Sequence, residues 1–335
     1  MIAARLLWLA MFAGGVLAAS ASVGAQETMQ LTPWGTLPDL PSSTATNPAP
    51  PSPPAAPAAP GADLAFGAFQ RGYYMTALQE AIKRIDANPN DGAAMTLIGE
   101  LYKDGLGVGR DAAEAAHWFR LAADRGDRQA TFALGIAYLE GTGVAKDRAM
   151  AQSLFEKAAA QGHAGALYNL GIMAIDGDKP DFIKAADYFR RAADAGDMDA
   201  MFSLAEFYQQ GTGVEKDLKK AADLLRQAAD DGNVGAEVEY GIALFNGVGL
   251  DKDEAAAAKY FLRAAAQNNP IAENRIARML AAGTGIQKDM IEAMKWHILA
   301  RAAGIKDDWL DAQLDTLSTQ DRLAVADAVR KYVGN

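Results

Sequence analysis

The chain has 335 residues, of which 50% are hydrophobic and only 8% aromatic, and its formal net charge is −10. This acidic balance and the lack of a basic stripe argue against nucleic-acid binding, which needs cationic side chains to replace phosphate counterions, and against binding to an anionic membrane surface. Cysteine is absent, which excludes disulfides, thiol nucleophiles, iron–sulfur sites and a lipid-modified N-terminal cysteine.

Residues 1–25 have the pattern of a signal peptide. A short start that contains Arg5 precedes the apolar run 6–19, and small residues lead up to Ala25. The run is short for a transmembrane helix, so we expect cleavage after Ala25, with Ala21 as the alternative site and an uncleaved anchor as the alternative interpretation. We therefore expect a periplasmic or secreted protein with no stable membrane insertion after signal cleavage.

Residues 26–62 are predicted to be a linker rich in proline and alanine. Ten prolines fall between Pro33 and Pro60, and such a segment favours extended conformations over a packed core. Helical patterning follows over 64–87, as one long or two short helices, and the Asn-Pro-Asn-Asp-Gly sequence at 88–92 ends it. We interpret residues 63–91 as an N-terminal capping region.

A 36-residue repeat occupies residues 92–305. Its marker is a Gly-x-Gly pair, and the spacings between successive pairs are 36, 70, 36 and 36, so the 70-residue gap hides one repeat that is two residues short. The pairs are Gly105/Gly107, Gly141/Gly143, Gly211/Gly213, Gly247/Gly249 and Gly283/Gly285. A fixed period of this length predicts stacked helical units, with six starts at Gly92, Arg128, Ala164, Met198, Val234 and Pro270.

Each repeat reads as helix A, a glycine turn and helix B. The glycines allow positive φ after helix A. An Asp or Asn precedes most A helices as an N-cap, with His163 as the exception, and an Asp four residues after the second glycine caps helix B; Asp181 takes this place in the short third repeat. Small residues recur in helix A at Gly99, Gly135, Gly171, Ala205, Gly241 and Ala277, and large ones in helix B at Trp118, Leu154, Tyr188, Leu224, Tyr260 and Trp296.

The periodicity ends after Gly304, and residues 306–335 contain two further helical patterns, 309–317 and 319–333. Because a terminal repeat would otherwise leave an apolar face exposed, we interpret this segment as the C-terminal cap.

These columns resemble the sel1-like repeat family, whose members are related to tetratricopeptide repeats. The second repeat carries the pattern at Ala130, Leu134, Gly135, Tyr138, Gly141, Gly143, Val144, Asp147, Ala151, Ala158, Ala159 and Gly162. The resemblance implies an all-α fold, a right-handed α/α superhelical solenoid of about six repeats, and an adaptor role in protein complexes. The alanine-rich style looks like that of an exported Gram-negative member, some of which are implicated in regulating envelope sensor systems.

No catalytic constellation is found. The Gly-x-Gly pairs follow helices rather than strands and lack the Gly-Lys-Ser/Thr of a phosphate loop, and His117, His163 and His297 lie in different repeats without metal-ligand spacing. No nucleophile motif is present. We therefore expect no enzyme activity, and no catalytic, cofactor or metal site.

The candidate partner site lies on helix A, which lines the concave face in the related tetratricopeptide geometry. The column expected to point there contains Thr96, Phe132, Tyr168, Phe202, Val238 and Asn274. Phe132, Tyr168 and Phe202 form an aromatic ladder, Asn169 takes the position where relatives often hold a peptide backbone, and Glu206 is a polar neighbour. Aromatic anchors with a polar rim suit a peptide groove; the alternative is that the rings pack between repeats.

We therefore expect a non-enzymatic adaptor or regulator in the bacterial envelope that binds a protein or peptide, such as an envelope signalling protein, through its concave face. One alternative is an envelope enzyme or a β-lactam-interacting protein, although the chain lacks the paired cysteines of the family members linked to β-lactams. A second alternative is a scaffold that self-associates through its end repeats.

Overall fold

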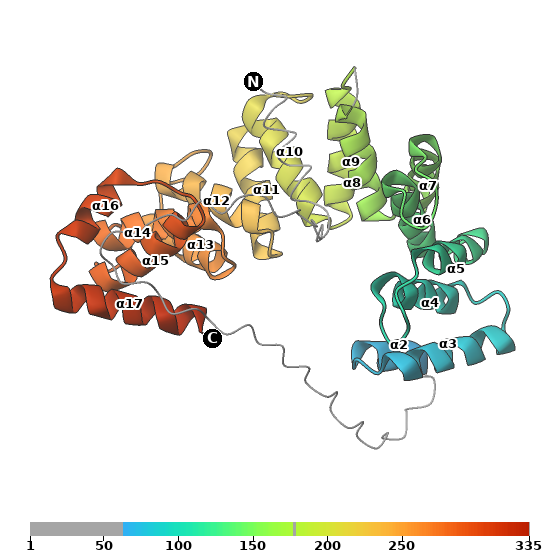
Figure 1. The fold of residues 1–335 in the computed structure, drawn as a ribbon. Helices are drawn as coiled ribbons and strands as arrows, with labels where there is room; N and C mark the ends of the chain where they lie inside the picture. Colours follow the sequence, from blue (N-terminus) through green and yellow to red (C-terminus); the bar gives the residue numbers. More distant parts are fainter. Residues whose placement is uncertain (1–62, 177–178, 335) are drawn as a thin grey trace. The chain divides into compact units, whose positions relative to one another are not determined.

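The computed structural model describes residues 63–176 and 179–334. The predicted signal peptide and linker, 1–25 and 26–62, lie outside the described residues. Contacts divide the chain into two units, Met1–Glu80 and Ala81–Asn335, and each is described by itself. Over the described residues the secondary structure consists of sixteen helices, labelled in Figure 1, and contains no strand.

The described part of the first unit contains α2 (Leu64–Gln70) and the beginning of α3 (Tyr74–Ala87). The side chain of Asp63 caps α2 by accepting a hydrogen bond from the backbone N–H of Phe66 at 3.0 Å. Gly72 separates the two helices with a φ of 78°, a conformation that glycine adopts without steric cost. The segment 64–87 therefore forms two helices rather than one.

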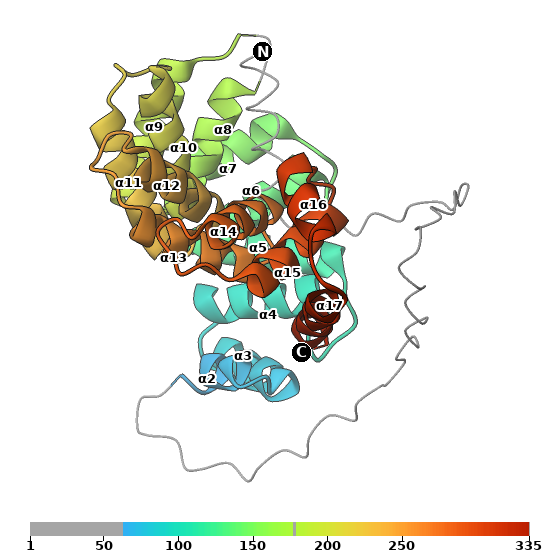
Figure 2. The same cartoon turned by 90° about the vertical axis from the view of Figure 1, so that its left-hand side faces the viewer.

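Six pairs of antiparallel helices fill most of the second unit (Figures 1 and 2). The A helices are α4 (Gly92–Asp104), α6 (Arg128–Glu140), α8 (Ala164–Ile175), α10 (Met198–Gln210), α12 (Val234–Asn246) and α14 (Pro270–Ala282). The B helices are α5 (Ala112–Asp124), α7 (Arg148–Ala160), α9 (Phe182–Asp194), α11 (Leu218–Asp230), α13 (Glu254–Ala266) and α15 (Met290–Ala302). Each B helix packs on its own A helix, and each of the first five also packs on the next A helix, which makes an α/α solenoid.

Two helices follow the last pair: α16 (Asp308–Asp315) and α17 (Thr319–Val333). Helix α17 packs along α15, where the Tyr332 ring meets the buried Trp296 ring edge-on at 5.1 Å between centroids. The last B helix is therefore covered by the C-terminal segment.

Local capping chemistry sets the ends of the helices, as the sequence predicts. The cap side chains accept backbone N–H bonds at the start of every A and B helix, including His163 before α8 and Asp181 before α9. Helices α4, α6, α10, α12 and α14 each end at the first glycine of a Gly-x-Gly pair, where φ lies between 70° and 81°. This left-handed C-cap is the conformation that favours glycine.

The second glycine of the pair has an additional role that the sequence analysis missed. A Cβ atom on Gly143 would lie 1.9 Å from the carbonyl oxygen of Ala112, which begins the B helix of the preceding repeat. Gly213 and Gly249 approach Phe182 and Leu218 in the same way, at 2.2 and 2.0 Å. The glycine turn of one repeat therefore packs directly against the start of helix B in the preceding repeat.

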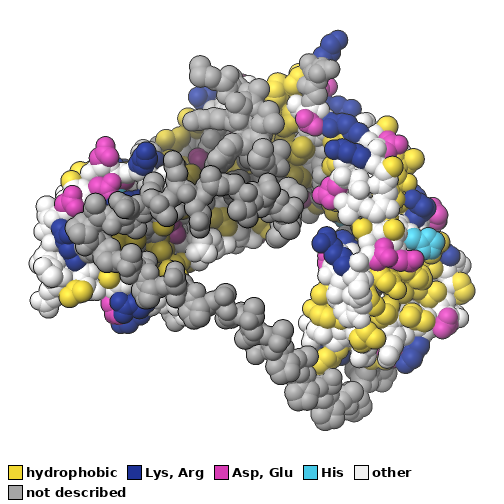
Figure 3. All heavy atoms as spheres, viewed as in Figure 1, with side chains coloured by type: hydrophobic (Ala, Val, Ile, Leu, Met, Phe, Trp, Pro, Cys, Tyr) yellow, Lys and Arg dark blue, Asp and Glu magenta, His cyan; other side chains and the backbone are white. Residues whose placement is uncertain are grey.

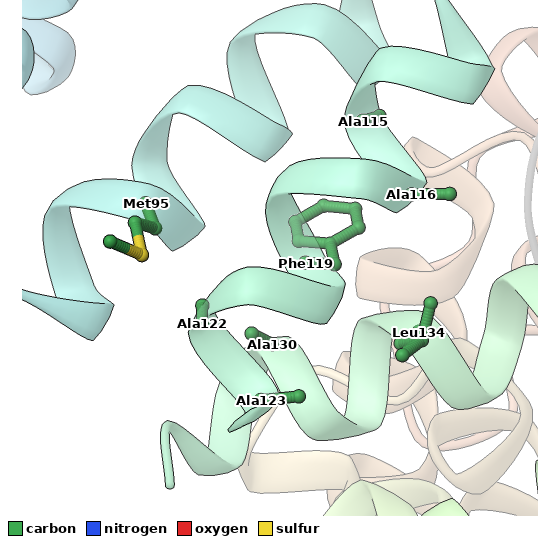
Figure 4. Packing of buried hydrophobic residues seen from close by; sticks show 8 residues of the cluster. All are labelled: Met95, Ala115, Ala116, Phe119, Ala122, Ala123, Ala130 and Leu134. Carbon is green, nitrogen blue, oxygen red and sulfur yellow. The ribbon is translucent and has the colours of Figure 1, made fainter. Parts of the chain in front are cut away.

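In the first five repeats the core is formed by large B-helix side chains one residue later than the predicted column, whereas Trp296 of that column is itself buried in the sixth repeat. Phe119, Phe155, Phe189, Leu225 and Phe261 are at most 2% exposed, whereas Trp118, Leu154, Tyr188, Leu224 and Tyr260 are only half-buried. In the first two repeats Phe119 of α5 lies with Met95 of α4 and Leu134 of α6 in one apolar cluster (Figure 4). A continuous core therefore runs through adjacent repeats.

Candidate functional site

The A helices repeat the same pattern of burial, so a position counted from the first residue of each helix describes all six. At position 9 every side chain is partly or fully exposed; the residues are Glu100, Ile136, Ile172, Glu206, Ile242 and Arg278. At position 6, one turn earlier, Asn169, Glu239 and Arg275 are also accessible. We call these nine residues the A-helix face.

The predicted aromatic ladder occupies position 5, and its rings pack toward the next repeat. The Phe132 ring stacks on the His163 ring with 4.2 Å between centroids. The ring of Phe202 lies against the start of α12, where a Cβ on Gly235 would be 3.2 Å from Cζ. Phe132 and Phe202 are half-buried, so these two aromatics keep an accessible part beside the A-helix face.

Tyr168, the middle residue of the ladder, is buried, with 8% of its surface exposed. Its ring lies 5.7 Å from that of Phe189. Burial, reinforced by the negative charge of Asp199, raises the pKa of the Tyr168 hydroxyl to about 12 even though a hydrogen bond with Ser203 opposes the shift. Tyr168 therefore stays neutral and offers a partner little surface.

Asn169 and Glu206, the two polar candidates, both belong to the A-helix face and are half-buried. The Asn169 side-chain amide donates to the carbonyl of Gly165 in its own helix at 2.8 Å. An Asn side chain carries two N–H donors and one carbonyl acceptor, so this bond fixes the amide and leaves its oxygen as an acceptor. The structure therefore brings Asn169 and Glu206 onto one face and places the aromatic ladder beside it.

Polar side chains at the starts of the A helices link consecutive repeats. The His163 ring caps α8 because Nδ1 accepts from the backbone N–H of Ala166 at 3.2 Å, and Nε2 lies 2.9 Å from Oε1 of Gln129 in α6. Burial, together with the positive charge of Arg128, lowers the pKa of His163. Asp199 and Asn233 make the equivalent link between α10 and α12 at 2.7 Å.

A pocket of about 400 Å³ lies at the C-terminal end of the A-helix face. Ile242 and Phe245 of α12 and Met279 of α14 give it an apolar lining, while Arg275 and Arg278 of α14 add two cationic side chains. Trp309 of α16 completes the lining and is 42% exposed. The sequence patterns do not predict this pocket; the one signal available in them is the pair of arginines, Arg275 and Arg278, within a single A helix.

Asp307, which precedes α16, fixes one side of the pocket. Its carboxylate accepts two hydrogen bonds from Arg278, one of them 2.8 Å from Nη2, and a third from the side chain of Asn274 at 2.7 Å. Although burial opposes ionisation, the bonds from Arg278, Asn274 and the Leu310 backbone lower the pKa of Asp307 to about 2. The Arg278 guanidinium in turn lies over the Trp309 ring, 5.5 Å from its centroid.

Other chemistry-bearing groups of the described residues stay apart. His297 is fully buried and lies 2.8 Å from an Asp311 oxygen, whereas His163 caps α8. Within 63–176 and 179–334 no group of three His, Asp or Glu side chains is arranged to hold a metal ion, and no helix is long and apolar enough to cross a bilayer. On the side drawn in Figure 3, acidic and basic side chains are interspersed among apolar ones.

The helix pairs coincide with the units of a known repeat. The Sel1 repeat profile matches six consecutive segments: 92–127, 128–163, 164–197, 199–233, 234–269 and 270–305. These segments make up more than half of the chain. The chain belongs to the Sel1 repeat family.

Solved Sel1 repeat structures agree with this assignment. The chain is 33% identical to a Sel1 repeat protein from Oxalobacter formigenes, with a TM-score of 0.66 over 71% of this chain and 98% of that one. It is 25% identical to c5321, a protective antigen of uropathogenic Escherichia coli strains that displays an SLR fold; the TM-score is 0.51, over 78% of this chain and 64% of that one. A search among curated proteins finds no match.

Membership in this family bears on function in general terms. Sel1 repeat proteins generally mediate protein–protein interactions, and their solenoid is typically a scaffold without catalytic activity. The A-helix face of this Sel1 repeat chain combines three half-buried isoleucines with acidic and basic neighbours, a mixture that is suited to contact with another protein.

Proposed function

We propose that this Sel1 repeat chain is a non-enzymatic adaptor or regulator of the bacterial envelope that binds a protein partner through its A-helix face. The observation that carries the proposal is the row of accessible position 9 side chains, in which Ile136, Ile172 and Ile242 lie among the charged residues Glu100, Glu206 and Arg278. The signal-peptide pattern of residues 1–25 supports the envelope location.

A repeat array suits this role because successive helix pairs extend one surface without needing a deep pocket. The half-buried isoleucines supply apolar area, which drives association, and their charged neighbours supply partner selection. Asn169 and Glu206 lie in the middle of the A-helix face, on α8 and α10, so we expect a bound chain to cross them. Phe132 and Phe202 would then contribute the accessible parts of their rings.

The test compares two double variants of the full chain in a pull-down from an envelope extract of the source cells. The first, Asn169→Ala with Glu206→Lys, changes the A-helix face. The control, Gln152→Ala with Glu156→Lys, likewise replaces one amide side chain by alanine and one Glu by Lys, at two exposed positions of the B helix α7. Both variants alter the net charge equally, so a difference between them cannot come from charge alone.

We expect a partner that is retained by the unchanged chain and the α7 control and lost from the α8/α10 variant, with circular dichroism showing that all three are folded. Equal retention by both variants would move the interface away from the A-helix face. Enrichment of no protein by the unchanged chain would count against the adaptor role itself.

A further inference from the structure

The pocket at the C-terminal end of the A-helix face has a distinct chemistry. It combines apolar walls from Ile242, Phe245 and Met279 with the guanidinium groups of Arg275 and Arg278, although the chain as a whole carries a net charge of −10. A cationic group between apolar walls is unlike the rest of the A-helix face, where Glu100 and Glu206 occupy the equivalent of the Arg278 position.

The two arginines differ in how their charge is balanced. Arg278 forms a two-point hydrogen-bonded ion pair with the buried Asp307, which matches its charge and holds its plane in place. Arg275 is exposed, and no ion pair or hydrogen bond of its side chain is found among the described residues. Within the described part of the chain, the pocket therefore presents one guanidinium without an ion-pair partner, beside a second that is held rigid by Asp307.

A guanidinium recognises planar, singly charged carboxylates through parallel hydrogen bonds. Recognition of a doubly charged phosphate normally uses a cluster of arginines, and of the two arginines that line the pocket only Arg275 lacks an ion-pair partner among the described residues. The volume of about 400 Å³ is at the low end of the range for small-molecule sites, which suits one apolar side chain together with a neighbouring carboxylate rather than a folded element.

We propose that this pocket binds an acidic peptide segment of the partner protein, with an Asp or Glu carboxylate on Arg275 and an adjacent apolar side chain between Phe245, Met279 and Trp309. The proposal rests on the function proposed above and names the chemistry that the partner carries. Asp307 acts as a positioning residue, because it orients Arg278 and starts α16, which brings Trp309 to the pocket.

The experiment uses three pools of short peptides and the ¹⁵N-labelled full chain. The first pool contains acetylated, amidated tetrapeptides in which Asp or Glu adjoins an apolar residue; the second replaces the acid by Asn or Gln; the third has no acidic side chain but a free C-terminal carboxylate. The reporter is the indole N–H signal of Trp309, assigned by its loss in Trp309→Phe. The variant is Arg275→Gln, and the control is Lys259→Gln, which removes a charge from an exposed position of α13.

We expect the first pool to shift the Trp309 signal and the second to leave it in place. Arg275→Gln should weaken the first pool's binding by about tenfold or more, because a charge-assisted hydrogen bond is lost, whereas Lys259→Gln should not. The proposal would be overturned if the Trp309 signal shifted with none of the three pools, or if it shifted equally with the first and second pools. A shift with the third pool alone would overturn the choice of a side-chain carboxylate. Because the α8/α10 variant leaves this pocket intact, a negative result here would not decide the outcome of the pull-down.

Discussion

At the scale of single residues, the helix A glycines and the buried B-helix side chains are matched in size. A Cβ added to Gly135 would lie 2.6 Å from the Phe155 ring. A Cβ added to Gly99, Gly171 or Gly241 would lie 2.5 to 2.8 Å from the ring of Phe119, Phe189 or Phe261, respectively. In the two repeats with alanine in this column, Ala205 and Ala277, the B-helix residue in the same register is Leu225 or His297 instead of Phe. Glycine, which lacks the methyl group of alanine, therefore leaves room for the phenylalanine ring of helix B.

This size matching predicts a coupled pair of substitutions. Gly135→Ala should lower the free energy of unfolding by about 1–3 kcal/mol, because the new methyl group overpacks the site against the fully buried Phe155. The double variant Gly135→Ala/Phe155→Leu copies the Ala205/Leu225 combination, so its loss should be smaller than the sum of the two single losses by about 1 kcal/mol. Urea denaturation of the three variants measures this coupling, and strictly additive losses would contradict the size-matching argument.

At the scale of the elements, the start of α8 depends on a neutral histidine. His163 caps the helix through Nδ1, an acceptor only when that nitrogen carries no proton. The A helices that follow α10 use Asn233 and Asn269 in the same place, and these caps do not titrate. Asp91, Asp127 and Asp197 cap the other A helices, α4, α6 and α10. The third repeat is therefore the one whose A helix is capped by a histidine, the residue type whose ordinary pKa lies closest to neutral pH.

The lowered pKa of His163 gives this sensitivity a definite sign. As the pH falls below the ordinary His value of about 6.5, the unfolded chain takes up a proton before the folded chain does, so the free energy of unfolding decreases; the full contribution is present above that value. His163→Asn should remove this part of the decrease between pH 7.5 and 5.5. Denaturation of both chains at the two pH values measures it, and identical slopes would show that the cap does not titrate.

The turns between helices give a second prediction at this scale. Gly143 and Gly162 both have positive φ, 73° and 78°, but a Cβ on Gly162 would meet nothing within 4 Å, whereas one on Gly143 would collide with the Ala112 carbonyl. Gly162→Ala should therefore cost only the left-handed backbone strain of about 1–2 kcal/mol, and Gly143→Ala distinctly more. Thermal unfolding of the two variants compares them directly, and equal midpoints would show that the close approach to the preceding repeat has no energetic consequence.

At the scale of the whole molecule, the Sel1 array is stabilised by contacts between neighbours. Each of the first five B helices packs on its own A helix and on the following one. In a repeat array held together by contacts between neighbouring repeats, a destabilising substitution acts mainly on its own repeat and the adjacent ones. The C-terminal segment is connected to the last repeat through Asp307, which binds Arg278 and Asn274 and caps α16.

This arrangement predicts a local effect of Asp307→Asn. Loss of the carboxylate removes the ion pair with Arg278 while the side chain still caps α16, so hydrogen exchange should rise in α16 and at the end of α14 and stay unchanged in α4 to α8. Because the pKa of Asp307 is lowered to about 2, its contribution is complete above about pH 4 and is lost only as the pH falls toward 2. Exchange that rises equally in α4 would contradict nearest-neighbour stabilisation.

The candidate site was only partly predictable from the sequence. The position 5 column contains the aromatic residues Phe132, Tyr168 and Phe202, which made it the obvious candidate. In the structure, however, Tyr168 is buried and the rings of Phe132 and Phe202 pack against the next repeat. Asn169 and Glu206 do belong to the accessible A-helix face. A shift of one residue turns a side chain about 100° around a helix, so a pattern that identifies the helix correctly can still select a column directed into the neighbouring repeat.

The sequence by itself determined the number of repeats, the first residue of each A helix and the left-handed helix ends, because caps and positive-φ glycines act over a few residues. Tertiary structure alone decided which columns face outward, why Gly143, Gly213 and Gly249 leave no room for a side chain, and how α12, α14 and α16 form a pocket. Those features depend on contacts between residues roughly one repeat apart, such as Asn274 with Asp307, and only the packing of one repeat on the next specifies them.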